Sequence, residues 1–182
     1  MKGKITVIVF ILLIPVLLTG CGALSRKMDE HHEKREEKID EGYEAIREMV
    51  FSGLYQFKAK RAYGAAFPSV DIAGGQYYLQ VHYYDVVADL PFYGTRHLAD
   101  IQGKSGIIID NKLEEIMIEE SDSRKRVLIR FSVEGDSEKF LINLDIGPGG
   151  EATLTVSSLR RSTISYIGKV TPTEPEEEEE KK

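Results

Sequence analysis

Apolar and polar residues alternate with a period of two along most of the chain between residues 54 and 170. Successive side chains of a β-strand point to opposite faces, so this alternation predicts strands with one buried face. The clearest ladder has three consecutive runs, at residues 127–133, 140–146 and 152–156. Shorter runs with the same character occupy residues 55–59, 70–72, 77–83, 107–109, 116–118 and 164–168.

Short turns separate these runs, among them Gly74-Gly75 and the Gly-Pro-Gly-Gly string that ends at Gly150. Consecutive strands joined by short turns pair antiparallel. We therefore predict an α+β fold that is mainly β, an antiparallel meander of about eight or nine strands. The pattern leaves a curved sheet, a sandwich and a partly closed barrel as alternatives. Polar residues such as Arg130, Ser132 and Asn143 are expected on a face in contact with water.

A different period precedes the strands. Ile39, Tyr43, Ile46 and Val50 recur at intervals of four, three and four residues, which places them on one face of a helix. We predict a helix over residues 27–52 that ends at Gly53 as its C-cap. Residues 21–38 form a tether that includes the first part of this helix, which is polar on all sides. The amphipathic part that follows is expected to dock on the β domain. The predicted domain therefore covers residues 39–170.

The first twenty residues have the layout of an export signal. Lys2 and Lys4 precede the apolar residues 5–18, and the segment closes on Leu18-Thr19-Gly20-Cys21. This string resembles the lipobox of bacterial lipoproteins, and the resemblance implies cleavage before Cys21 and a diacylglyceryl group on its sulfur. Acyl chains of that kind hold a protein on a bilayer. The alternatives are an ordinary signal peptide with a chance cysteine and an N-terminal membrane helix.

The C-terminal residues 171–182 contain two prolines and a run of five glutamates. Such a segment has no apolar surface to bury, so we predict a disordered acidic tail.

Composition narrows the classes of function. The chain has 24 Lys and Arg residues against 30 Asp and Glu residues, a net charge of −6. This acidic balance argues against a nucleic-acid partner, which requires a basic face. The single cysteine excludes a disulfide framework and a cysteine-based zinc site.

No motif for catalysis, metal binding or a cofactor emerges from the sequence. A Gly-x-Ser-x-Gly elbow is missing, and the adjacent His31 and His32 point about 100° apart on a helix, so they cannot chelate together. His82 lies on a predicted strand and His97 in a loop. The acidic run from Glu119 to Asp122 lacks the glycine and the final glutamate of a calcium loop. We predict a protein that is not an enzyme and that holds no cofactor.

The string Leu90-Pro-Phe-Tyr-Gly94 is the most distinctive one in the domain. Pro91 ends the preceding strand because it lacks an N–H group, and Gly94 permits a sharp turn. Phe92 and Tyr93 are expected to point in opposite directions. One interpretation is a binding loop formed by Phe92, Tyr93, Arg96 and His97, and the other is a plug that closes one end of the sheet.

Five strings together resemble the domain of unknown function 4251 family of Bacteroidota lipoproteins. They begin at Tyr55, Tyr78, Leu90, Ala152 and Ile164, and the resemblance covers about residues 44–170. The strongest are Leu90-Pro-Phe-Tyr-Gly94 and Ile164-Ser-Tyr-Ile-Gly168. The resemblance implies an exported, lipid-anchored, mostly β domain and favours the outer membrane, and it supplies no catalytic residues. The segment between Ala62 and Pro68 is longer than the family pattern, so the first turn is expected to differ.

Three classes of function remain open. We favour a lipid-anchored binding or assembly module of the cell envelope, with the membrane as one partner and a protein or a small molecule as the other. Tyrosines on strands and loops suit such recognition surfaces. The alternatives are a structural component of the envelope and, with less support, a hydrolase.

Overall fold

The computed structural model describes residues 20–65, 67–97, 106–136 and 138–173, with side chains from residue 31 onward. Residues 1–19 of the predicted export signal, the side chain of Cys21 and residues 174–182 of the predicted acidic tail lie outside the described residues. The chain divides into two compact units, Met1–Ile39 and Asp40–Lys182. The second unit holds the end of the helix and all the described strands.

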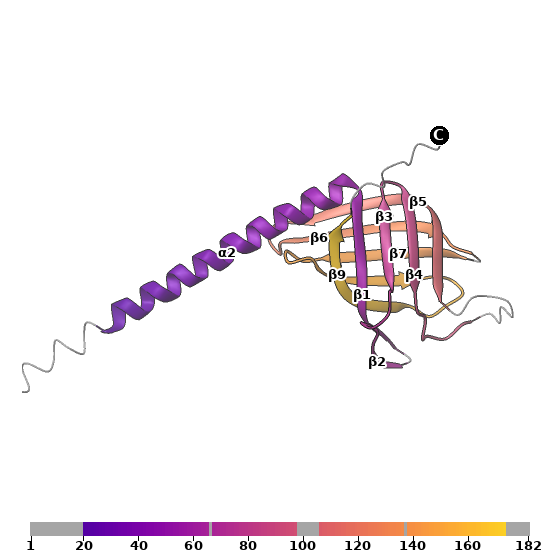
Figure 1. The fold of residues 1–182 in the computed structure, drawn as a ribbon, viewed down its shortest axis with the longest axis horizontal. Coiled ribbons are helices and arrows are strands. Elements are labelled where there is room, and N and C mark those ends of the chain that lie inside the picture. Colours follow the sequence, from indigo (N-terminus) through magenta and orange to yellow (C-terminus); the bar gives the residue numbers. More distant parts are fainter. Residues whose placement is uncertain (1–19, 66, 98–105, 137, 174–182) are drawn as a thin grey trace, which may run out of the picture. The chain divides into compact units, whose positions relative to one another are not determined.

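One helix and nine strands make up the described part of the chain (Figure 1). In chain order they are α2 (Gly20–Ser52), β1 (Leu54–Gly64), β2 (Phe67–Asp71), β3 (Tyr78–His82), β4 (Asp85–Leu90), β5 (Ile107–Ser121), β6 (Arg126–Glu134), β7 (Lys139–Ile146), β8 (Glu151–Ser157) and β9 (Ile164–Pro172). Within the described residues, no helix combines the length and the apolar character needed to cross a membrane.

The strands form a closed barrel. Every neighbouring pair is antiparallel, in the order β2-β1-β3-β4-β5-β6-β7-β8-β9, and β1 also pairs with β9. Eight strands therefore close into a ring, and β2 adds to the free part of β1 beyond the end of β3. The predicted antiparallel meander is confirmed, and of its alternatives the barrel is correct, although it closes completely rather than partly.

Side chains fill the inside of the barrel. The inward positions of each strand are buried and form one apolar cluster with the end of the helix. Among its largest members are Tyr55, Tyr166, Phe57, Leu79, Leu90, Ile107, Ile109, Ile129, Ile142, Leu144 and Ile146, each less than 2% exposed. Eight strands give an interior just wide enough for side chains, so this barrel is packed as a core.

One strand departs from the predicted pattern. Residues 107–109 and 116–118, expected as two short strands, belong to the single long strand β5. A bulge lies between Glu114 and Met117, where Glu115 has a φ of 53°. This irregularity turns Ile116 and Met117 outward, so both are exposed. Ser132, expected in contact with water, is buried where it faces the Glu114 carbonyl across the bulged pair.

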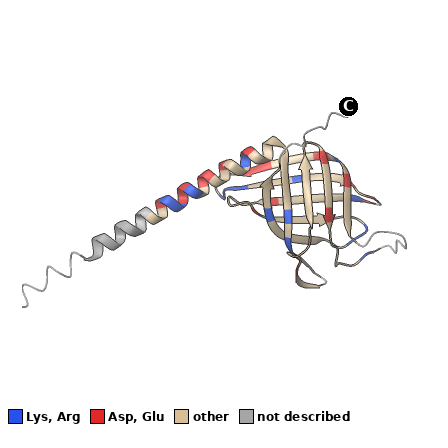
Figure 2. Ribbon diagram, viewed as in Figure 1, with Lys and Arg blue, Asp and Glu red and all other residues tan. Residues whose placement is uncertain are grey.

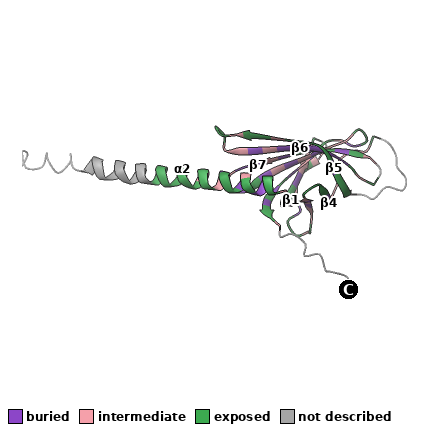
Figure 3. Cartoon of the chain, turned by 90° about the horizontal axis from the view of Figure 1, so that it is seen from above, coloured by how far each residue is buried: buried purple, intermediate pink, exposed green. Residues whose placement is uncertain are grey.

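The end of α2 covers one end of the barrel. Tyr43, Ile46, Met49 and Val50 are buried in the core, while the remaining side chains of this segment face solvent (Figure 3). The helix begins at Gly20, earlier than predicted, because no residue between 20 and 27 interrupts it. It ends at Ser52 as predicted, and Gly53 adopts a left-handed φ of 72° typical of a glycine that follows a helix.

Candidate functional site

The loop after β4 covers the other end of the barrel. Phe92 packs against the core, whereas Tyr93 is 42% exposed and lies against the Phe67 ring, with 5.7 Å between the ring centroids. The hydroxyl of the buried Tyr166 donates a hydrogen bond to the Pro91 carbonyl at 2.8 Å. These contacts give Phe92 and Tyr93 the opposite orientations that the sequence predicted.

The same loop is fastened to the connection between β8 and β9. The Thr95 amide donates to the Ser162 hydroxyl at 3.0 Å, and the Ser162 amide donates to the Thr95 carbonyl at 2.9 Å. The His97 amide donates to the Arg160 carbonyl at 2.8 Å. The four predicted binding residues Phe92, Tyr93, Arg96 and His97 thus lie along one fastened loop, and none of them is among the residues that line the pocket described below.

A buried ion pair lies beneath this loop. Arg161 Nε donates to Glu138 Oε1 at 2.6 Å, and the two side chains are only 8% and 5% exposed. Arg161 Nη1 also donates to the Gly106 carbonyl at 2.8 Å. The guanidinium lies between the rings of Phe92 and Phe140, at 5.2 and 5.8 Å from their centroids. This single cation therefore contacts three separate segments at one end of the barrel: the loop that contains Phe92, Gly106 just before β5, and the start of β7 with Glu138 and Phe140.

One atom of this pair has no partner. Glu138 Oε2 is buried and accepts no hydrogen bond from the described residues. Buried polar atoms in folded proteins nearly always have a partner, and an exception therefore requires an explanation. A carboxylate oxygen is only an acceptor, so the group that would satisfy Oε2 must be a donor.

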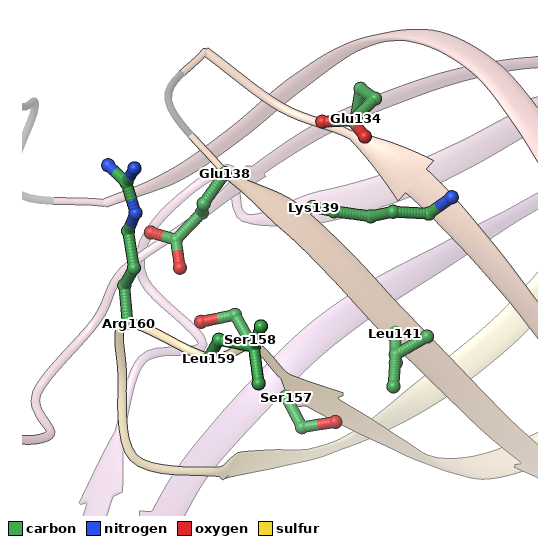
Figure 4. Close-up of a pocket in the computed structure, with 8 residues that line it drawn as sticks. All are labelled: Glu134, Glu138, Lys139, Leu141, Ser157, Ser158, Leu159 and Arg160. Carbon is green, nitrogen blue, oxygen red and sulfur yellow. The ribbon is translucent and has the colours of Figure 1, made fainter.

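A pocket of about 540 Å³ lies beside this carboxylate, on the outer wall of the barrel (Figure 4). Its residues come from the ends of β6, β7 and β8 and from the connection that follows β8. Leu141 and Leu159, which are 58% and 98% exposed, supply its apolar surface. The lining consists of Glu134, Glu138, Lys139, Leu141, Ser157, Ser158, Leu159 and Arg160.

The polar groups of the pocket differ in how they are paired. Lys139 Nζ contacts Glu114 Oε2 at 2.6 Å, and this hydrogen bond raises the pKa of Lys139. Arg160 and Glu134 form no ion pair within the described part of the chain. The Ser158 hydroxyl accepts a hydrogen bond from the Arg161 amide at 3.1 Å, which leaves its own proton available to donate. Apolar surface with a few converging polar groups is the usual composition of a small-molecule site.

Catalytic and metal chemistry find little support in the described residues. No group of three or more His, Cys, Asp or Glu side chains in this part of the chain could hold a metal ion. Burial raises the pKa of Tyr55 and Tyr166 well above the usual range, so both phenols stay neutral inside the core. The arrangement of exposed leucines and polar groups in the pocket can bind a ligand.

Sequence reasoning missed this site. Glu138 and Leu141 lie at the start of β7 and Arg160 lies in the connection after β8, and none of them belongs to a motif. Residues 159–162 contain two adjacent arginines, and nothing in this string separates the exposed Arg160 from the buried Arg161.

Comparison with known proteins identifies the family. The family model described as "Domain of unknown function (DUF4251)" matches residues 37–170. A crystal structure of a DUF4251 family protein from Bacteroides eggerthii DSM 20697 is similar in fold, with a TM-score of 0.56 and 15% sequence identity. That match covers 72% of this chain and 87% of the other chain. The search of curated proteins gave no match. The chain therefore belongs to the DUF4251 family.

Proposed function

We propose that this protein is a lipid-anchored, non-enzymatic binding protein of the cell envelope, and that the outer-wall pocket is its ligand site. The packed interior carries this proposal. Barrels that bind ligands internally leave room between their inward side chains, but here those positions are closed by residues such as Tyr55, Phe57 and Tyr166. A small ligand must therefore bind on the outside, and the pocket beside Glu138 has a volume within the usual range for such sites.

The anchor in this proposal is a lipid on Cys21. Its support comes from the sequence alone, namely the two lysines, the apolar run and the Leu-Thr-Gly-Cys string. Family membership is compatible with export to the outer membrane, as the resemblance to Bacteroidota lipoproteins implies.

Ligand binding is tested on the mature chain, residues 21–182, with Cys21→Ser so that no lipid is attached. A library of small amphipathic compounds is screened by the shifts of backbone amide resonances. We expect shifts to gather at residues 157–160. Leu159→Glu should abolish them, because Leu159 is almost fully exposed and its replacement leaves the core unchanged.

Ile167→Glu is the matched control, since Ile167 is also exposed but does not line the pocket. Compounds whose shifts gather elsewhere, or that bind Leu159→Glu equally well, would refute the pocket as the ligand site.

The anchor is tested by fractionation of cells that express the full chain with Cys21→Ala. The wild type should sediment with membranes and incorporate labelled palmitate, whereas the variant should keep its signal peptide and take up no label. Equal palmitate labelling of the two chains would exclude Cys21 as the lipidated residue.

A further inference from the structure

We infer that the ligand of the outer-wall pocket carries a hydrogen-bond-donating head, a hydroxyl or an amine, on an aliphatic body, and that this head binds Glu138 Oε2. The inference rests on the proposed function, because it names the chemical class that the same pocket would accept. Three features of the pocket support it: the unpartnered Oε2 of Glu138, the groups around this oxygen, and the exposed side chains of Leu141 and Leu159.

Glu138 is half satisfied by the protein itself. Oε1 accepts the hydrogen bond from Arg161 Nε at 2.6 Å, while Oε2 accepts none. The exposed fraction of the Glu138 side chain is only 5%. Its carboxylate points toward Ser158 and Arg160, both of which line the pocket (Figure 4). A donor that enters from the pocket would complete the coordination of this carboxylate.

Access to Oε2 requires one side chain to move. The atom is covered, and in Figure 4 the Arg160 side chain runs past the Glu138 carboxylate. Arg160 is exposed and forms no ion pair among the described residues, so its rotation breaks no interaction of that kind. Exposed side chains change rotamer within nanoseconds. Arg160 is therefore the residue that we expect a ligand to displace.

The remaining surface favours an aliphatic body. Leu141 and Leu159 line the pocket and expose most of their area to water, so a ligand that covers them would remove apolar surface from water. In Figure 4 Ser158 lies near the Glu138 carboxylate and Ser157 lies farther away, on the side toward Leu141, so the Ser158 hydroxyl suits the polar end of an amphipathic molecule. The pocket volume of about 540 Å³ is ample for a chain of eight carbons.

Charge in the pocket does not select the ligand by itself. The lining carries two carboxylates, Glu134 and Glu138, and two cations, Lys139 and Arg160. Discrimination must then come from hydrogen bonding at Oε2. A carboxylate head would place a second acceptor against this oxygen, where neither group can donate. We therefore expect alcohols and amines to bind, and acids of the same length to bind poorly.

Three probes of equal length test this class: 1-octanol, octylamine and octanoate, each titrated at pH 8 into the mature chain with Cys21→Ser. We expect octanol and octylamine to bind with Kd values at least about tenfold lower than octanoate, since a site built for a donor rejects an analogue that lacks it. The amide shifts of residues 157–160 report the location. Octanoate that binds as tightly as the other two would overturn the inference, and so would the failure of all three probes to bind.

Glu138→Gln is the decisive variant, because an amide keeps an acceptor for Arg161 and presents a donor on its other atom. The order of the probe affinities should change in this variant. Octylamine should lose about tenfold in affinity, and octanoate should bind more tightly than it binds the wild type. The thermal melt shows whether the variant is folded. Leu159→Glu should weaken all three probes, and Ile167→Glu none. If octanoate binds at residues 157–160 and Leu159→Glu abolishes it, the proposed function stands while the inference about the head group fails.

Discussion

The two ends of the barrel are closed by different chemistry. At one end the helix buries Tyr43, Ile46, Met49 and Val50, and its ion pairs lie at the surface, as between Arg47 and Glu120 at 2.6 Å. At the other end a loop inserts Phe92 over a buried ion pair. Figure 2 shows that Lys, Arg, Asp and Glu residues occur over the strands and along the helix.

This difference determines which substitutions should destabilise each end of the barrel. A surface ion pair contributes at most about 1 kcal/mol, because water screens it. A buried pair adds little over an apolar replacement, but the loss of one partner leaves an uncompensated charge. The helix end should therefore respond to changes in packing, and the loop end to changes in charge.

Arg161→Ala should produce the largest effect. It leaves the Glu138 carboxylate buried without its cation, and we expect the free energy of unfolding to fall by about 3–5 kcal/mol. Urea denaturation measures this change. The double variant Arg161→Met with Glu138→Leu is the control, since it removes both charges and should recover most of the stability. A double variant as unstable as Arg161→Ala would show that the guanidinium contacts, rather than the unpaired charge, dominate.

Phe92→Ala should come next, with a loss of about 2–3 kcal/mol. The ring packs on the core but remains half-buried, so the loss should fall below the range for a fully buried phenylalanine. It also removes one of the two rings that contact the Arg161 guanidinium. Tyr93→Ala is the matched control, because Tyr93 is more exposed. Thermal melts in which the Tyr93 variant suffers more would contradict the role of Phe92 as the plug.

Gly42→Ala tests the packing at the helix end. In an isolated helix this change adds about 1 kcal/mol of stability. Here the new methyl carbon would lie 2.4 Å from the Pro148 carbonyl oxygen, so we expect a loss of about 1–3 kcal/mol instead. Glu41→Ala, on the exposed neighbouring position, should stay within about 0.5 kcal/mol of the wild type. A stabilised Gly42 variant would mean that the helix does not pack on the turn that contains Pro148.

Tyr43→Phe should have the smallest effect, about 1 kcal/mol near neutral pH, from the loss of its 2.8 Å hydrogen bond to Asp122. Burial, the hydrogen bond to Asp122 and the Asp122 charge raise the pKa of Tyr43 from 10.0 to about 12. The contribution of Tyr43 is thus complete below pH 10 and is lost as the pH rises toward 12. Between pH 10 and pH 12, the free energy of unfolding measured by denaturation should fall less steeply with pH for Tyr43→Phe than for the wild type. Parallel pH profiles for the two proteins would show that Tyr43 does not titrate differently in the folded and unfolded states.

The sequence was informative where a single regular pattern controls the structure. The alternation at residues 127–156 predicted three strands and their buried faces, and the spacing of Ile39, Tyr43, Ile46 and Val50 predicted a helix whose later members are buried. Both patterns arise from periodic burial, which leaves a direct trace in the order of residues.

The rest depends on contacts between distant segments. The bulge at Glu114 reverses the alternation in β5 without any glycine or proline to mark it. Closure of the ring depends on the pairing of β1 with β9, and no local signal carries that choice. The pocket and the Glu138–Arg161 pair depend on how the connection after β8 lies against the start of β7, and no local signal groups these residues beforehand.

The pairing of β1 with β9 also has a consequence for how the protein folds. The first strand of the barrel completes its pairing only when the last strand is present, because Tyr55 lies opposite Pro172 at the far end of the domain's sequence. Contacts between such distant residues slow folding, since loop-closure entropy is lost before they form. Until β9 arrives, β1 and β8 each present an open edge on which another chain can add a strand. A chain that ends before β9 should therefore aggregate rather than form a smaller barrel. The pairing of β1 with β9 should be the step after which the molecule proceeds to its native state.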